Sequence, residues 1–307
     1  MTVPASGDAL SRIAASFEEA RGQALSAQAG RRKIAALIVA ALALGALCVV
    51  LLARFDPVTS SVFAAVAAGL VVAWTRRPVA AFQREVKTAA FTALLAREGP
   101  GWSFDPDGAI DLAPFERARI LPGHDRAKHR DVIRGRRGGM PLEIAELVLT
   151  ERRGSGKNRR TVIVFRGVAL RFDLGRPVRA HTVVLRRFGH PGLFTRLERV
   201  RLEDPVFEDA FNVFSEDQVA ARVLLTTSFM ERLLALSDDL ARLGGNREAR
   251  LTAAFREDRF LALVPCRTDL FEVRKIGDPA ALRADLERLS TELSDVVGVA
   301  DRLRVGA

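Results

Sequence analysis

The sequence is poor in the residues that build disulfide, metal and phenolic sites. It has two cysteines, four histidines and no tyrosine in 307 residues. Two cysteines cannot make a disulfide scaffold, and any role that depends on a phenol hydroxyl is excluded. The histidines His124, His129, His181 and His190 have no cysteine or acidic pattern around them that would complete a metal site. We therefore expect neither a metal nor a cofactor.

The chain does contain a long uncharged apolar run. Residues 34–53 carry no charged side chain, and at 1.5 Å per residue they form a helix of about 30 Å, which matches the hydrocarbon core of a bilayer. Residues 57–75 form a second, weaker stretch, in which small residues recur four positions apart and allow close helix packing. We predict a two-span transmembrane helical hairpin over residues 34–76.

Basic residues flank this hairpin at both ends. Residues 31–33 and 76–77 are all Arg or Lys, whereas the short link between the spans has a single Arg. The positive-inside rule then places both termini in the cytoplasm and the protein in the inner (cytoplasmic) membrane. Cys48 is predicted to lie in lipid and Cys266 in the cytosol, so no disulfide can join them.

Three further segments follow from the apolar periodicity. Residues 1–33 form an N-terminal cytoplasmic segment with a modest amphipathic stripe, typical of a surface helix or a frayed terminus. Residues 77–98 predict an amphipathic juxtamembrane helix that continues the second span or kinks at Pro78. Residues 99–307 predict a cytoplasmic domain.

Within that domain, apolar and polar residues alternate in short runs, which predicts β-strands. The predicted strands are 131–137, 141–151, 161–173, 181–188, 199–203, 250–256 and 259–265. The predicted helices are 114–121, 216–225, 229–243 and a last helix after Asp278-Pro279. We therefore expect an α+β fold in which an antiparallel β-sheet packs against helices. The last helix repeats leucine every three or four residues, so that face either packs on the sheet or forms a homodimer seam.

One block of the sequence resembles a known family. Residues 207–234 read FEDAFNVFSEDQVAARVLLTTSFMERLL, and they are similar to the F-x-V-[YF]-x-x-D-Q-x-x-A-R-x-x-L-T block of the bacterial membrane proteins grouped as domain of unknown function 3137. Phe165-Arg166-Gly167 is similar to that family's F-[KR]-G element. The resemblance extends over most of 79–276. It implies a transmembrane pair before a soluble domain, and it implies no known activity.

Asp217, Gln218 and Arg222 in this block are the strongest polar candidates for a functional patch. A structural interpretation competes with that one. Asp217 suits a helix N-terminus, Gln218 completes a capping box with Ser215, and Arg222 pairs back one turn. The structural interpretation is favoured.

The chain carries a charge of +10, from 47 basic and 37 acidic residues, which suggests an anionic partner or surface. Five of the basic residues are candidates for contact with anionic lipid headgroups or a protein partner: Arg152, Arg153, Lys157, Arg159 and Arg160. Gly154-Ser-Gly-Lys157 among them resembles a P-loop, but Glu151 occupies the first glycine position and Asn158 follows the lysine. We predict a hairpin loop instead. Aromatic residues are sparse along the basic strands, so we do not expect nucleic-acid binding.

These features favour a non-enzymatic module. We expect an integral membrane protein whose cytoplasmic domain binds a protein partner or an anionic lipid surface. The alternative is a membrane-anchored enzyme with an active site around Asp217 and Arg222, which would require a concave site with convergent polar groups.

Overall fold

The computed structural model describes the following residues: 15, 17–53, 57–187, 189–191, 196–245, 250–267, 269–273 and 279–302. The chain divides into two compact units, residues 1–90 with 273–287 and residues 91–272 with 288–307.

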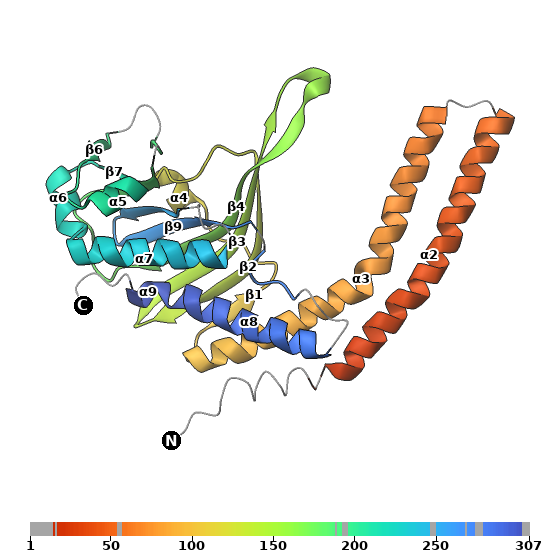
Figure 1. Ribbon diagram of the computed structural model, residues 1–307, viewed down its shortest axis with the longest axis horizontal. Coiled ribbons are helices and arrows are strands. Elements are labelled where there is room, and N and C mark those ends of the chain that lie inside the picture. The colour runs from red at the N-terminus through yellow and green to blue at the C-terminus, as the bar shows by residue number, and fades with distance from the viewer. Residues whose placement is uncertain are drawn as a thin grey trace. The chain divides into compact units, whose positions relative to one another are not determined.

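The first unit is built on two long helices, α2 (Glu18–Ala53) and the greater part of α3 (Pro57–Glu98) (Figure 1). The guanidinium of Arg31 on α2 lies 5.0 Å from the ring centroid of Trp74 on α3 and donates to the Trp74 carbonyl at 3.3 Å. The rings of Phe17 and Phe82 meet edge to face at 6.0 Å. Because α2 runs without a break from Glu18 to Ala53, residues 18–33 and the apolar run form one helix. The residues of the predicted amphipathic stripe before residue 15 lie outside the described part of the chain.

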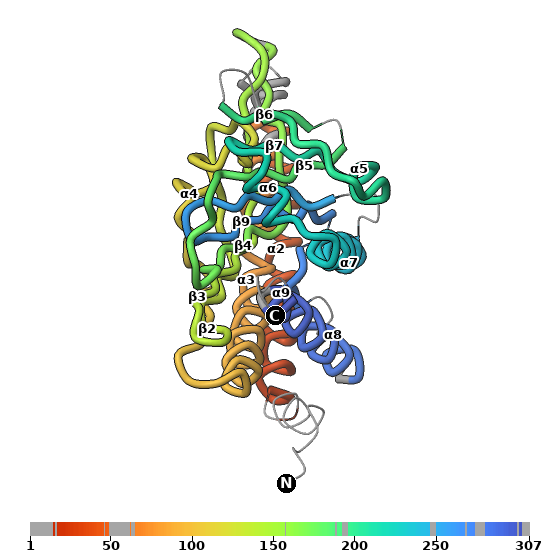
Figure 2. The backbone as a smooth tube through the Cα atoms, turned by 90° about the vertical axis from the view of Figure 1, so that its left-hand side faces the viewer, coloured from red at the N-terminus to blue at the C-terminus, as the bar shows by residue number. Residues whose placement is uncertain are grey.

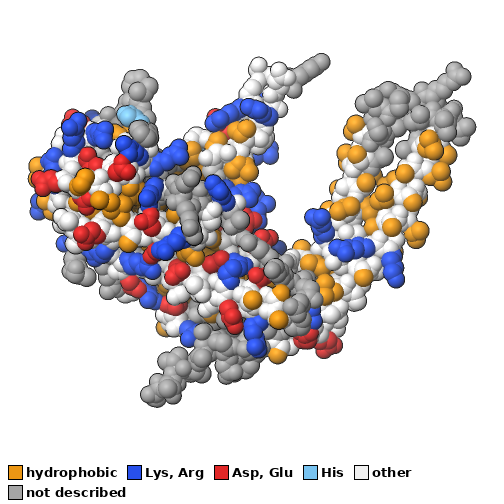
Figure 3. Space-filling model, in the orientation of Figure 1, with side chains coloured by type: hydrophobic (Ala, Val, Ile, Leu, Met, Phe, Trp, Pro, Cys, Tyr) orange, Lys and Arg blue, Asp and Glu red, His pale blue; other side chains and the backbone are white. Residues whose placement is uncertain are grey.

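The helical pair exposes apolar side chains where a soluble protein would bury them. Ten of the large apolar side chains that the structure describes as exposed lie between Ile34 and Val72, and Figure 3 shows them along both helices. Among the described residues, one stretch, Ala65–Glu98, is long and apolar enough to cross a membrane. The structure thus has two long helices where the hairpin was expected and one candidate span among the described residues, so the two-span transmembrane hairpin is not confirmed.

Pro78 lies inside α3 and does not end it. Proline removes one backbone hydrogen bond and clashes with the preceding turn, so it bends a helix that continues through it. Figure 1 shows α3 changing direction along its length. The juxtamembrane helix predicted over residues 77–98 is therefore the continuation of the second apolar stretch.

The second unit is a nine-stranded sheet in which every neighbouring pair is antiparallel, in the order β1-β2-β3-β4-β9-β8-β5-β7-β6. The strands are β1 (Ser103–Asp105), β2 (Arg126–Arg137), β3 (Met140–Arg153), β4 (Arg160–Asp173), β5 (Thr182–Arg186), β6 (Glu198–Val200), β7 (Phe211–Ser215), β8 (Thr252–Arg256) and β9 (Arg259–Pro265). This confirms the predicted α+β class and its antiparallel sheet. The strands β1 and β7 were not expected from the sequence.

Helices lie on both faces of this sheet. The helices of the second unit are α4 (Ala113–Arg117), α5 (Pro205–Ala210), α6 (Gln218–Leu224), α7 (Thr227–Leu243) and α9 (Val299–Arg302), whereas α8 (Pro279–Val297) is divided between the two units. Figures 1 and 2 place α7 on one face and α4 on the other. Phe115 of α4 is buried in a cluster with Leu147, Phe165 and Leu261 from three strands, and Phe229 of α7 packs edge to face on Phe255.

The leucine face of α8 is buried. Its members Leu282, Leu286, Leu289, Leu293 and Val296 are at most 3% exposed. Burial of this face within the chain accounts for the leucine repeat, and its packing on the sheet itself stays a prediction. A homodimer through this helix stays a prediction, and it would have to use the remaining residues of α8.

Candidate functional site

A long β-hairpin arm projects from the sheet, formed by residues 151–166 at the ends of β3 and β4. Pairing of β2 with β3 stops at Arg126 and Thr150, and pairing of β9 with β4 stops at Gly167 and Pro265. Beyond these points β3 and β4 pair with each other only, out to Arg153 and Arg160. Figure 1 shows this β3–β4 arm extending past the neighbouring strands. The predicted hairpin loop over 154–158 is confirmed, with a 3₁₀ turn, Gly156–Asn158, at its tip.

The end of the β3–β4 arm is cationic. Residues 152–160 contain five basic residues and no acidic one, and blue side chains gather on the arm in Figure 3. Arg152, Arg159 and Arg160 are exposed and form no ion pair with any described residue, whereas Arg153 pairs with Glu151 at 2.8 Å. Lys157 lies on the 3₁₀ turn. The five predicted contact residues thus lie together at the end of one protruding element.

The three residues of the predicted patch lie on α6 or at its start. Asp217 is the N-cap of α6, and its Oδ1 accepts the backbone N–H groups of Val219 and Ala220 at 2.8 and 3.0 Å. Gln218 donates to Glu198 Oε2 at 3.4 Å. Arg222 is exposed, and the described residues offer it no ion pair. The predicted pairing of Arg222 back one turn is therefore not found.

Ser215 does not cap α6 as predicted. It is the last residue of β7, it is fully buried, and its hydroxyl donates to the carbonyl of His181 at 3.1 Å. The same oxygen lies 3.0 Å from the Thr182 hydroxyl. Burial lowers the pKa of His181, and the positive charge of Arg256 lowers it further. The neutral ring is placed to donate from Nε2 to the Ala118 carbonyl at 3.2 Å, so His181 joins two elements and is not a free base.

A cleft of about 370 Å³ beside α4 holds a second group of charges, which no sequence pattern connects. Buried Glu143 on β3 lies between two arginines of the adjacent strands. Its Oε1 accepts from Arg134 Nε at 2.7 Å, and its Oε2 lies 2.6 Å from Arg171 Nη2. The strand register produces this alignment, because Arg134, Glu143 and Arg171 are direct cross-strand partners. Opposite charges at directly facing positions stabilise a sheet, and with two arginines to one glutamate this group keeps a net charge of +1.

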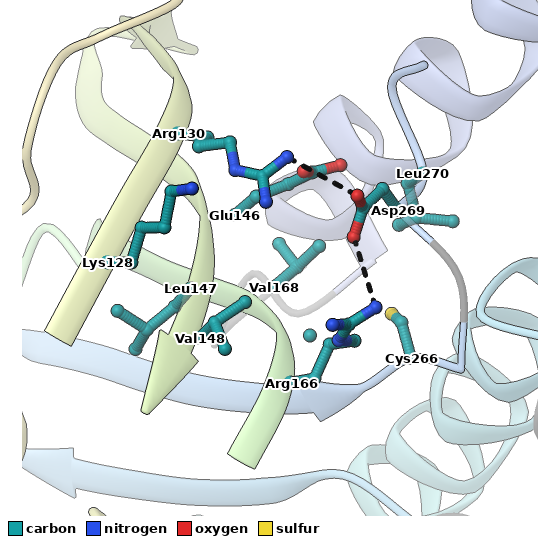
Figure 4. Close-up of a pocket in the computed structure, with 11 residues that line it drawn as sticks. Lys128, Arg130, Glu146, Leu147, Val148, Arg166, Val168, Cys266, Asp269 and Leu270 are labelled. Carbon is teal, nitrogen blue, oxygen red and sulfur yellow. Dashed lines mark hydrogen bonds and ion pairs between the residues drawn. The ribbon is translucent and has the colours of Figure 1, made fainter. Parts of the chain in front are cut away.

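A third cluster surrounds the F-[KR]-G element and is shown in Figure 4. Asp269 lies between Arg130 and Arg166, at 3.4 and 3.8 Å. Buried Glu146 accepts the backbone N–H of Phe271 at 3.0 Å. The cavity measures about 10 Å³, which is room for one water molecule and for no substrate. No group of three or more metal-binding side chains is found in the described part of the chain.

Cys266 in this cluster is expected to be chemically inert in the folded protein. Burial raises the pKa of its thiol from 9.0 to about 12, and the negative charge of Glu146 adds to the effect. Because the thiolate is the reactive species, a Cys48→Ala chain treated with Ellman's reagent at mildly alkaline pH should react only after unfolding. Equally fast labelling of the native and unfolded chains would contradict this expectation.

The raised pKa of Cys266 also makes stability depend on pH. The contribution of the buried neutral thiol to the free energy of unfolding is complete below pH 9 and is lost as the pH rises towards 12.

Comparisons with known proteins confirm the family resemblance and add no function. Residues 163–305, just under half of the chain, match the family described as "Protein of unknown function (DUF3137)". No curated protein matches the chain. Among solved structures, the mycobacterial trehalose monomycolate transport factor A, TtfA, is similar with a TM-score of 0.35 and 10% identity, over 68% of this chain and 93% of that one. A similarity at this level carries no inference about activity.

Proposed function

We propose that this chain is an integral membrane module whose β3–β4 arm binds anionic lipid headgroups on the cytoplasmic side. In this proposal both apolar helices cross the bilayer and both termini are cytoplasmic. The single observation that carries it is the protruding arm with five basic residues and no acidic one between residues 152 and 160.

The helical pair supports the membrane part of the proposal. Ten of its large apolar side chains between residues 34 and 72 are exposed, and a pair of helices that exposes so much apolar surface needs a lipid or protein environment. Arg31 and Trp74 contact each other at the end of the apolar run. Tryptophan and arginine are the residues that favour the headgroup region. This position is the expected cytoplasmic boundary of the anchor.

The composition of the arm supports a lipid surface over a folded protein as its ligand. A basic residue near an anionic leaflet contributes about 1 kcal/mol, so several arginines held on one rigid hairpin give appreciable binding without a shaped pocket. Ile163 on the same arm is 56% exposed. An apolar side chain among cations is typical of elements that enter the headgroup layer.

Charge reversal on the arm tests the proposal. The full chain is held in neutral phosphatidylcholine nanodiscs and mixed with vesicles of phosphatidylcholine alone or with phosphatidylglycerol. We expect binding to the anionic vesicles only, weakening with salt as the charges are screened. Arg152→Glu/Arg159→Glu/Arg160→Glu should lower the affinity at least about a hundredfold, since three favourable contacts of about 1 kcal/mol are lost.

A matched variant separates this site from net charge. Arg119, Arg201 and Arg267 are exposed and lie outside the arm. Reversing these three to Glu gives the same change in net charge and should change vesicle affinity less than about threefold. Equal binding to neutral vesicles, or an equal loss in the two variants, would refute the proposal. Binding that resists salt would also count against it.

A further inference from the structure

The short helix α6 exposes apolar side chains that the proposed lipid site does not use. Outside the two long helices, the structure describes four large apolar side chains as exposed. One is Ile163 on the arm and one is Val206 on α5. The other two, Val219 and Val223, lie one turn apart on α6 and are 69% and 62% exposed. Two valines at this spacing form a small apolar face on a helix.

This face borders a groove of about 190 Å³. Ala220, Val223 and Leu224 of α6 form one wall, and the segment 174–180 after β4 forms the other. Leu174 in that segment is buried, and Val178 is held by a hydrogen bond from its N–H to the Glu257 carbonyl at 2.6 Å. The 174–180 wall is therefore fixed to the sheet, and α6 is anchored by its buried Ala221.

The two charged residues that line the groove are both arginines. Arg176 and Arg179 line it, Arg222 lies on α6 beside Val223, and all three are exposed. None of the three has an ion pair with a described residue, and no acidic side chain is among the groove's lining residues. Arginines held apart from carboxylates at an apolar site are free to bind a partner's carboxylates.

We infer that this α6 groove binds an acidic segment of a partner protein, which inserts one large apolar side chain between α6 and residues 174–180. The size of the groove favours a side chain, because small-molecule sites usually occupy 300–1,000 Å³. The segment's Asp and Glu residues pair with the surrounding arginines. This binding does not depend on the lipid contact proposed for the β3–β4 arm, which uses other residues.

Peptide display on the full chain tests the inference. The protein in neutral phosphatidylcholine nanodiscs is used to select from a library of random peptides on phage. We expect recovered peptides enriched in Asp and Glu around Leu, Ile, Phe or Met. Val219→Ser/Val223→Ser should lower their affinity at least about tenfold, because burial of the anchor is lost. Arg176→Gln/Arg179→Gln should lower it about fivefold and reduce its salt dependence.

Val206→Ser is the matched control. Val206 is 67% exposed, like the two α6 valines, and lies outside the groove, so its replacement should change peptide affinity less than about twofold. The inference is overturned if no peptides are enriched, or if those recovered bind the α6 double-serine variant as well as the wild type. It is also overturned if that variant loses only vesicle binding, or only self-association of the chain. The first of these two outcomes would show that the face contacts lipid, and the second that it contacts another copy of the chain.

Discussion

Replacing Gly167 by alanine should destabilise the sheet by about 3–5 kcal/mol. A Cβ atom at this position would lie 1.9 Å from the carbonyl oxygen of Val264 and 3.0 Å from the backbone N of Cys266. Both atoms belong to main chain next to β4 and cannot turn aside as a side chain can. The methyl group must therefore separate β4 from β9, which breaks backbone hydrogen bonds and overpacks the centre of the sheet.

The measurement is thermal unfolding of the full chain in detergent, followed by circular dichroism. For a unit of this size we expect the melting temperature to fall by roughly 10 °C. Gly123→Ala is the control, because a Cβ there meets nothing within 4 Å, and it should melt within about 2 °C of the wild type. Hydrogen exchange should show lost protection in β9 first. A Gly167→Ala protein that melts with the wild type would show that β9 is not held as the structure has it.

This close approach also explains part of the sequence resemblance. The glycine of the F-[KR]-G element has no special φ angle. It is needed because the backbone of the neighbouring strand occupies the space where a side chain would stand. From the sequence, Gly167 could be identified as part of a motif in a strand. The requirement for glycine at this position comes from β9, which follows almost one hundred residues later in the chain. No local sequence pattern contains that information.

The elements that the sequence predicted well are those whose own pattern is long. The strands β3 and β4 carry long apolar runs, and the hairpin between them is marked by Gly154 and Gly156 with positive φ. Only residues 131–137 of β2 were predicted, because the first half of that strand is mostly polar. The five basic residues of the arm were found for the same reason, because they are close together in the chain. Local patterns are sufficient where a single hairpin determines the arrangement.

The elements that were missed are held by their neighbours. The five residues of β7 read as the approach to a helix, and Ser215 resembles an N-cap when it is seen before Asp217 and Gln218. In the structure β7 is held between β5 and β6, so tertiary pairing decides its conformation. The short helix α5 and the groove beside α6 likewise depend on contacts between distant segments. Only the exposure of Val219 and Val223, which no periodicity reveals, marks that surface.

Removing the carboxylate of Glu143 is expected to cost about 2–3 kcal/mol. The group is 7% exposed, and it is the ion-pair partner of both Arg134 and Arg171. Glu143→Ala leaves two guanidinium groups facing each other across β3 without a negative charge between them. Breaking one partner of a fully buried pair costs 3–5 kcal/mol. The arginines here are 43% and 28% exposed, so solvent screening reduces that figure.

Chemical denaturation of the full chain measures this cost, and a double-mutant cycle locates it. Glu143→Leu/Arg171→Met should be more stable than Glu143→Leu alone, because it removes one of the two guanidinium groups that the lost carboxylate leaves facing each other. Arg171→Met alone should cost less than Glu143→Leu, because Glu143 keeps Arg134 as its partner. Glu151→Ala removes the more exposed Glu151–Arg153 pair and should cost less than about 1 kcal/mol. If Glu143→Ala instead stabilised the protein, the three charges would be held together at a cost to folding. Such a cost is characteristic of residues kept for a ligand, and the cleft beside α4 would then replace the arm as the first place to search for one.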